Sequence, residues 1–294
     1  MNGPSIQCIQ DAVRHALAED LAFGDVTTRA LFSQPRPARA SIVARHSMIV
    51  AGIAVAREVF FSIDPSLKII KAFHDGHNTS TEDSVLIVEG DGRSLLMAER
   101  VVLNFMQRLS GIATLTWRFC EAVRGYPTRI LDTRKTTPGL RALEKWAVRL
   151  GGGHNHRGSL SDGLLIKDNH LALLHAERIG LAQACRQARA VGPHGLKIMV
   201  EVQQLGEVKE ALSGEADVIL LDNMTPSQVR QAVGRIKGRA LVEVSGGITL
   251  TNAKDMAVAG ADFLSIGALT HSAPAADLSL DLRAISARTR RDRS

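Results

Sequence analysis

From about Gly125 onward, short apolar runs alternate with stretches of helical periodicity, and this alternation constrains the fold more than any other feature of the chain. Runs that are apolar throughout are typical of strands covered by helices on both faces of a parallel sheet. The number of repeats favours a barrel over a short open sheet, while periodicity alone leaves closure undecided. The expected strands are 129–131, 163–166, 197–202, 217–221, 240–244 and 262–266, and the expected helices are 138–150, 172–190, 205–212, 226–236 and 252–259.

The first part of the chain has a different pattern, which predicts a mixed α+β region. We expect a helix over 6–19 and strands over 38–50, 68–73 and 85–89. A turn over 90–92 then leads into a long helical region, 95–123, which is too apolar for a free surface helix. We expect this region to be broken near Gly111.

Composition excludes several classes of protein. The 294 residues are 45% hydrophobic, which is enough for a substantial core. The net charge of +6 fits anionic substrates without requiring a polynucleotide, and only 4% of residues are aromatic, so little material exists for stacking bases. We read the basic end, 288–293, as a solvated terminus, and we expect no nucleic-acid partner.

Cysteine usage and hydropathy indicate the compartment. The three cysteines, Cys8, Cys120 and Cys185, are widely spaced and form no Cys-x-x-Cys pair, which fits a reducing environment. No apolar run approaches the roughly 20 residues that span a bilayer, and charged residues interrupt the N-terminus. The sequence therefore predicts a soluble cytoplasmic protein without a membrane partner.

Charged or glycine-rich residues recur directly after the expected strands. Because α/β barrels place their chemistry at the carboxyl ends of parallel strands, these residues are expected to share one site. Two clusters rich in Arg, Lys, His and Thr, 132–141 and 151–157, bracket one expected helix. Such cations at the end of a buried strand indicate a binding site for a multiply charged anion.

Small residues follow two consecutive late strands. Ser245, Gly246 and Gly247 end one, and Gly267 and Ala268 end the next. Glycine lets the backbone approach an anion closely, and barrels of this class bind phosphate at this position. A plain turn is the alternative for each glycine taken alone, but the pair on adjacent strands favours a phosphate site.

Glu201 and Asp222 end two neighbouring strands. Paired carboxylates can act as acid and base, bind Mg²⁺ or hold sugar hydroxyls. For Asp222 an alternative is a helix N-cap ahead of Thr225 and Pro226. The histidines near the cationic clusters are not read as a zinc site, because neighbouring Arg and Lys would repel a cation.

These segments resemble the quinolinate phosphoribosyltransferase family, and the resemblance covers nearly the whole chain in order. The segments that carry it are 19–20, 24–28, 98–105, 109–114, 132–141, 151–157, 165–170, 200–202, 221–224, 243–248 and 267–272. The sequence departs from the family at Gly158-Ser159, at Gln203-Gln204 and at 74–78, which puts local loop geometry in doubt but removes no residue with an expected role.

The resemblance implies a fold and a reaction. The expected fold is an N-terminal α/β sandwich over 1–112, joined by the C-terminal tail 271–294, followed by an incomplete, open α/β barrel over 113–270. The family transfers phosphoribose from phosphoribosyl pyrophosphate to the nitrogen of quinolinate, with Mg²⁺. It releases pyrophosphate and CO₂ and forms nicotinate mononucleotide.

The resemblance also implies residue roles. Quinolinate carboxylates are expected at Arg134, His156 and Arg157, with help from Thr133 and Lys135. Lys135 and Lys167 are expected near the pyrophosphate and the reacting centre. Glu201 and Asp222 are expected to hold the ribose hydroxyls or the metal. The 5′-phosphate is expected at Ser245, Gly246, Gly247, Gly267 and Ala268. Arg100 is expected to reach the site of a neighbouring subunit in a homodimer or hexamer.

Three alternatives remain at this point. Proteins associated with molybdenum transport share the fold and the Arg-Lys-Thr-x-Pro-Gly element, but they usually lack the combination of 154–157 with 166–170 that is present here. Nicotinate phosphoribosyltransferases bind one carboxylate, whereas the dense Arg and His cluster favours two. A basic nucleic-acid-binding protein would explain the net charge but not Glu201 and Asp222 among cations.

Overall fold

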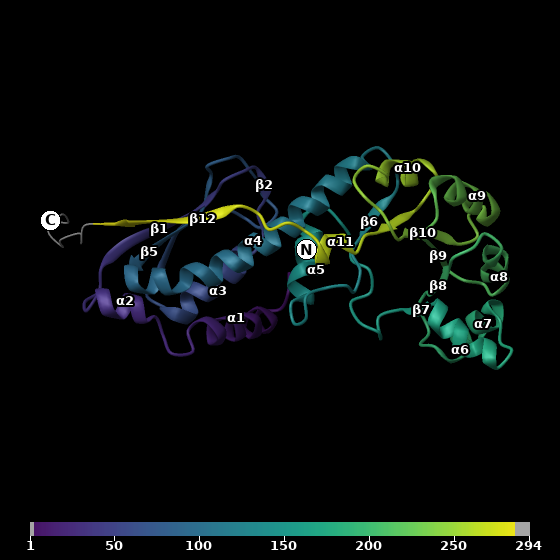
Figure 1. Cartoon of the computed structure of the whole chain (residues 1–294), viewed down its shortest axis with the longest axis horizontal. Coiled ribbons are helices and arrows are strands. Elements are labelled where there is room, and N and C mark those ends of the chain that lie inside the picture. Colours follow the sequence, from purple (N-terminus) through teal and green to yellow (C-terminus); the bar gives the residue numbers. More distant parts are fainter. Residues whose placement is uncertain (1–2, 286–294) are drawn as a thin grey trace. The chain divides into compact units, whose positions relative to one another are not determined.

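The computed structural model describes residues 3–285, which form two compact units (Figure 1). Unit 1 comprises residues 3–115, 137–151 and 273–285, and unit 2 comprises 116–136 and 152–272. The expected domain ranges differ from this division mainly at 137–151, which was expected in the barrel. The basic tail 288–293, with the rest of 286–294, lies outside the described residues.

Unit 1 is built on an antiparallel sheet with strand order β12-β1-β5-β3. The C-terminal strand β12 (Leu278–Ala284) pairs with β1 (Pro37–Ala44), so that Ala284 lies opposite Ala38. The C-terminal segment therefore completes the N-terminal sheet, as the family fold implies. The other strands are β3 (Lys68–Ala72) and β5 (Ser84–Asp91), and a separate pair is formed by β2 (Met48–Ile49) and β4 (Asn78–Thr79).

Most helices of unit 1 bury apolar side chains in its core. The helices of this unit are α1 (Ile6–Asp20), α2 (Val26–Leu31), α3 (Ile53–Ile63), α5 (Arg141–Leu150) and the first part of α4 (Gly92–Ala122). The helix α5 buries Leu143, Ala147 and Val148, which explains its place in this unit. No helix within residues 3–285 is both long enough and apolar enough to cross a membrane.

The predicted break near Gly111 is wrong, because α4 runs without interruption from Gly92 to Ala122. Gly111 instead allows another backbone segment to lie close against the helix. A Cβ atom at this position would lie 2.1 Å from the carbonyl oxygen of Pro274. The missing side chain lets the backbone that leads toward β12 pass directly against the helix.

Unit 2 contains six parallel strands in the order β6-β11-β10-β9-β8-β7. Each predicted strand is present, with bounds that differ by one residue at most. The strands are β6 (Arg129–Leu131), β7 (Leu164–Ile166), β8 (Ile198–Val202), β9 (Val218–Asp222), β10 (Leu241–Ser245) and β11 (Phe263–Ser265). Strands β6 and β7 form the two edges of this sheet, and the described residues contain no pairing between them. The sheet is thus an open barrel.

Helices connect these strands. They are α6 (Asp168–Ala176), α7 (Leu181–Val191), α8 (Glu207–Ser213), α9 (Pro226–Ile236), α10 (Ala253–Val258) and α11 (Ala268–His271). The single helix predicted over 172–190 is wrong, since the structure divides this region at 177–180. Val200, Ile219, Leu221 and Val244 are fully buried on alternate positions of the strands. The positions between them carry the polar residues of the site described next.

Candidate active site

A cavity of about 800 Å³ lies at the carboxyl ends of the parallel strands, within unit 2. Every residue that the sequence analysis assigned to the site lines it except Arg100. The assigned residues that line it are Thr133, Arg134, Lys135, His156, Arg157, Lys167, Glu201, Asp222, Ser245, Gly246, Gly247, Gly267 and Ala268. Arg100 lies in unit 1 on an exposed position of α4.

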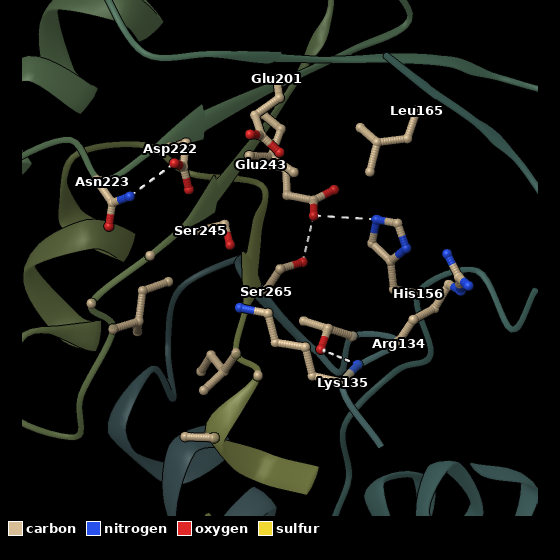
Figure 2. A pocket seen from close by; sticks show the side chains of 18 of the residues that line it. Arg134, Lys135, His156, Leu165, Glu201, Asp222, Asn223, Glu243, Ser245 and Ser265 are labelled. Atoms are coloured by element: carbon tan, nitrogen blue, oxygen red, sulfur yellow. Dashed lines mark hydrogen bonds and ion pairs between the residues drawn. The ribbon is translucent and has the colours of Figure 1, made fainter. Parts of the chain in front are cut away.

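Strand register arranges the polar residues of the cavity in two rows. Glu201 on β8 and Glu243 on β10 both pair with Leu220 on β9, so the three side chains project from the same face of the sheet. Asp222 pairs with Ser245 one step nearer the carboxyl ends, and Ser245 pairs with Ser265. Figure 2 shows both rows facing the cavity, with Lys135 reaching toward them from the opposite side.

Two guanidinium groups, those of Arg134 and Arg157, line the cavity. Burial and the nearby charge of Arg134 hold the pKa of Arg157 below its usual value. Arginine nevertheless stays protonated in proteins, so the two cations repel each other until an anion lies between them. One nitrogen, Nη1 of Arg157, also donates to the carbonyl oxygen of Gly163 at 3.0 Å, which orients the side chain.

The loop after β6 is held by its own hydroxyl groups. Thr133 Oγ1 accepts the backbone N–H of Lys135 at 3.1 Å, and Thr270 Oγ1 donates to the carbonyl oxygen of Lys135 at 2.7 Å. Both contacts restrain the Lys135 backbone, so the exposed side chain is fixed at its base while its ammonium end can move.

Glu201 and Asp222 have side-chain partners at the cavity. Nζ of Lys167 donates to Oε2 of Glu201 at 2.8 Å, and Nδ2 of Asn223 donates to Oδ2 of Asp222 at 2.8 Å. The N-cap alternative for Asp222 is wrong, because Thr225 caps α9 and accepts the backbone N–H of Gln228. Asp222 therefore does not cap this helix, and it borders the cavity.

Two left-handed glycines follow β10. Gly246 has φ +86°, and a Cβ there would lie 2.2 Å from Oδ1 of Asn223, the residue that orients Asp222. Gly247 has φ +63°, and a Cβ there would meet no atom within 4 Å. This edge of the cavity is therefore bare backbone, which suits close approach of a phosphate.

The loops that depart from the family pattern are locally ordered. The backbone N–H groups of Gln203 and Gln204 both donate to Oε2 of Glu207, at 2.7 and 3.0 Å. The backbone N–H of Gly158 donates to Oδ2 of Asp162 at 2.8 Å. Carboxylates close by in sequence thus stabilise both turns.

The sequence analysis gave no individual role to several residues of the cavity. These are Leu165, Leu220, Asn223, Glu243, Ile248, Thr249, Ser265, Ile266 and His271. Glu243 had a detectable signal, because it is a charged residue inside an apolar strand in the same Val-Glu-Val context as Glu201. Leu165 and Leu220 had none, since an apolar residue in an apolar strand carries no mark of the face it occupies.

No three His, Cys, Asp or Glu side chains among residues 3–285 lie close enough together to hold a metal ion by themselves. Glu201 and Asp222 nonetheless provide carboxylate oxygens from neighbouring strands at the wall of the cavity. Oxygen donors of this kind suit Mg²⁺, which is commonly bound by one or two carboxylates together with substrate phosphates.

Two family models match the chain, namely the N-terminal domain of quinolinate phosphoribosyl transferase over residues 25–110 and its C-terminal domain over 112–281. The nicotinate-nucleotide pyrophosphorylase [carboxylating] of Mycobacterium leprae is 43% identical and covers 93% of this chain and 96% of its own. The probable enzyme of the same name from Bacillus subtilis is 39% identical and covers 93% of both chains.

A solved structure of NadC from Streptococcus pyogenes has a TM-score of 0.91 at 39% identity, with 97% of this chain and 100% of the other covered. The matches extend over both units and include the strand ends that form the cavity. Neither the molybdenum-transport nor the nucleic-acid alternative predicts such agreement. The chain belongs to the quinolinate phosphoribosyl transferase family.

Proposed function

We propose that this chain transfers phosphoribose from phosphoribosyl pyrophosphate to the nitrogen of quinolinate, with loss of CO₂, to form nicotinate mononucleotide for de novo NAD biosynthesis. One observation carries the proposal. Arg134 and Arg157 line the same cavity as Glu201 and Asp222 and a bare glycine edge. This combination matches a dianionic acceptor beside a phosphorylated sugar.

The acceptor would bind at the cationic side of the cavity. Quinolinate carries two adjacent carboxylates, and a guanidinium group can bind each with two parallel hydrogen bonds. Arg134 and Arg157 are assigned to these carboxylates, with Thr133, Lys135 and His156 beside them. Binding an anion here would also relieve the repulsion between the two guanidinium groups, so substrate binding and the electrostatics of the pocket favour each other.

The phosphoribosyl donor would occupy the rest of the cavity. Glu201 and Asp222 are assigned to the ribose hydroxyls or to a metal that accompanies the donor. The bare backbone of Ser245, Gly246 and Gly247, with Gly267 and Ala268, is assigned to the 5′-phosphate. Lys135 and Lys167 are assigned to the departing pyrophosphate, whose negative charge their ammonium groups would stabilise.

Positioning and charge stabilisation account for most of the chemistry. The bond from the ribose C1′ to the pyrophosphate oxygen breaks, and the quinolinate nitrogen forms a bond to C1′ through an oxocarbenium-like transition state. The ring nitrogen is then a pyridinium. When the adjacent carboxylate leaves as CO₂, the pyridinium accepts the electron pair at the ring carbon, which takes up a proton. No separate electron-sink cofactor is required.

Mg²⁺ is the proposed ion for this site, and it would arrive with phosphoribosyl pyrophosphate. It would neutralise charge on the pyrophosphate. Glu201 and Asp222 are the residues that would contribute oxygen ligands, and in the structure Nζ of Lys167 contacts Glu201 at 2.8 Å. Chelation with EDTA should abolish turnover, and added Mg²⁺ should restore it.

Assembly and location are part of the same proposal. The exposed side of α4 carries Arg100, which is assigned to the active site of a neighbouring subunit in a homodimer or a hexamer of a cytoplasmic enzyme. Mixing Arg100→Ala protein with Lys135→Ala protein tests this. If each site takes Arg100 from a neighbour, mixed oligomers contain some sites with neither defect and regain activity. Absence of any regain after subunit exchange would contradict the sharing.

The proposed reaction is tested by incubating the protein with quinolinate, phosphoribosyl pyrophosphate and Mg²⁺ and following nicotinate mononucleotide and CO₂ together. We expect equal amounts of both products. Nicotinate replaces quinolinate in a parallel reaction, because it lacks one carboxylate and should be used at least tenfold less efficiently. Product from nicotinate alone would overturn the assigned acceptor, and failure with both would overturn the activity.

A further inference from the structure

We propose that Glu243 is a positioning residue for the acceptor, which acts through His156 to fix Arg157 at the wall of the cavity. The inference rests on the proposed function, since it assigns a task within the quinolinate pocket. Glu243 is a carboxylate in a cavity suited to anions, where its charge opposes substrate binding unless another group engages it. The structure shows which groups do so.

The carboxylate of Glu243 is held by two neighbours. Its side chain is 2% exposed, and Oε1 accepts a hydrogen bond from Oγ of Ser265 at 2.5 Å. The same Oε1 lies 3.3 Å from Nε2 of His156, at an ion-pair distance without the alignment of an ideal hydrogen bond. Both contacts are visible in Figure 2. They partly offset the negative charge that Glu243 places at the wall of the cavity.

The second ring nitrogen of His156 defines its tautomer. Nδ1 accepts the backbone N–H of Arg157 at 2.8 Å, so in the neutral ring the proton lies on Nε2, the atom that faces Glu243. Nε2 is also buried. Because Nδ1 is engaged by the backbone and Nε2 is buried against Glu243, the guanidinium group of Arg157 is the one that we assign to the substrate. This differs from the direct binding role that the resemblance implies for His156.

The loop that carries His156 is fixed from a second side. Asp132, fully buried after β6, accepts the backbone N–H of His156 at 2.9 Å and the side-chain amide of Asn155. Arg157 is thus held at its backbone by His156 and at its side chain by Gly163. The polar chain Ser265–Glu243–His156–Arg157 links β11 and β10 to the loop, which sets where the guanidinium group lies.

Glu201 and Glu243 are both buried, but they differ in how exposed their partner side chains are. Both flank Leu220 in the same row, and both follow a valine in an apolar strand. Glu201 contacts Lys167, whose side chain is 44% exposed and able to move toward a ligand. Glu243 contacts His156, whose side chain is 8% exposed. A carboxylate paired with a fixed ring can position a neighbour, whereas one paired with a mobile ammonium group can exchange partners.

The test is the kinetic profile of Glu243→Gln, which keeps the shape but removes the charge. We expect the KM for quinolinate to rise about tenfold or more, with the KM for phosphoribosyl pyrophosphate and kcat changed less than threefold. Ser265→Ala should raise the quinolinate KM by a smaller factor. The control is Glu210→Gln on the exposed side of α8, which should match the unchanged protein. An unchanged quinolinate KM, or an equal rise in both KM values, would overturn the proposal.

A second measurement reports on the contact without turnover. Nitrogen-15 spectra of histidine-labelled protein should show the His156 ring with its proton on Nε2, the signal being assigned by its loss in His156→Gln. Glu243→Gln should shift this signal while the other histidine signals stay in place. If the unchanged protein fails to use quinolinate, the proposed function is wrong, but an unshifted His156 signal would independently contradict the assignment of Glu243.

Discussion

The amino ends of the parallel strands in unit 2 form the amino edge of the sheet, and their carboxyl ends form the carboxyl edge. Carboxylates have different partners at these two edges. At the amino edge, Asp217 accepts the backbone N–H of Ile198 at 2.7 Å, and Asp262 accepts that of Val242 at 2.8 Å. Asp217 also accepts a hydrogen bond from Nη2 of Arg189 at 2.8 Å. At the carboxyl edge, Glu201 and Asp222 are engaged by the side chains of Lys167 and Asn223 and border the cavity. The same chemical group therefore accepts strand N–H groups at one edge and lines the cavity at the other.

The identity of the partner explains this difference. A backbone N–H at the start of a strand needs an acceptor, and removing that acceptor leaves a buried donor unsatisfied. A side-chain partner can rotate away when a ligand arrives, so its carboxylate remains available. We therefore expect substitutions at the amino edge to change the free energy of unfolding and substitutions at the carboxyl edge to change turnover.

The largest expected effect on activity is that of Lys135→Ala. Because the proposed role of its ammonium group is to stabilise the leaving pyrophosphate, its removal should lower kcat by about 100-fold or more, by analogy with removing one donor to a developing charge. The melting temperature should stay unchanged, because the side chain is exposed. The matched control is Lys197→Ala, an exposed lysine directly before β8 at the amino edge, which should retain full kcat. Near-normal kcat in Lys135→Ala would remove this residue from the mechanism.

Asp222→Asn should have the next largest effect. Hydrogen bonds to a charged group contribute roughly 1.5–3 kcal/mol, so kcat/KM for phosphoribosyl pyrophosphate should fall by about 10- to 100-fold. Thermal unfolding should be unchanged, since Thr225 rather than Asp222 caps α9. Steady-state kinetics with varied donor, together with a melting curve, checks both statements. A lower melting temperature with normal kinetics would place Asp222 with the structural carboxylates of the amino edge.

Gly246→Ala and its control Gly238→Ala compare glycines with positive φ at the carboxyl and amino edges. The new methyl group would collide with Asn223, which orients Asp222, so we expect about a tenfold rise in the KM for the donor. Gly238, at φ +74° and with no atom near a Cβ, supplies the matched control at the amino edge. Gly238→Ala should lose about 1–2 kcal/mol of stability from backbone strain alone and keep its kinetics. Equal kinetic effects in the two variants would contradict the distinction between the edges.

Asp262→Ala should have the smallest effect on activity and a clear effect on stability. It leaves the buried N–H of Val242 without its acceptor, which should lower the free energy of unfolding by about 1–3 kcal/mol. Urea denaturation followed by circular dichroism gives this value. We expect kcat and both KM values to be unchanged when they are measured well below the melting temperature. A kinetic defect without loss of stability would reverse the assignment of this edge.

Much of the fold could be predicted from the sequence because the strands of unit 2 are mostly apolar and are bounded by polar residues. Strand β6, for example, has the predicted bounds Arg129–Leu131. Gly111 was misread because a helical glycine that breaks the helix and one that admits a neighbouring backbone look alike in sequence. The division between α6 and α7 depends on a short stretch, 177–180, that lacks a strong breaking signal other than its final glycine.

The site could be predicted as far as residues follow strands. Arg134, Lys167 and Asp222 stand at strand ends, and parallel strands bring their carboxyl ends to one edge. Glu243 and Ser265 lie within strands, and their orientation into the cavity depends on register with β9 and β10, which a single sequence does not specify. The link from Glu243 to Arg157 through His156 depends on a loop conformation, which composition alone could not reveal.

The most direct test of this account is a crystal structure with quinolinate bound. We expect the two carboxylates at the guanidinium groups of Arg134 and Arg157, with the ring nitrogen facing the side of the cavity that holds Glu201 and Asp222. Glu243 should remain in contact with His156. Quinolinate bound at the amino edge of the sheet, or a ring nitrogen turned away from Glu201 and Asp222, would contradict the assignment of the carboxyl edge as the catalytic site.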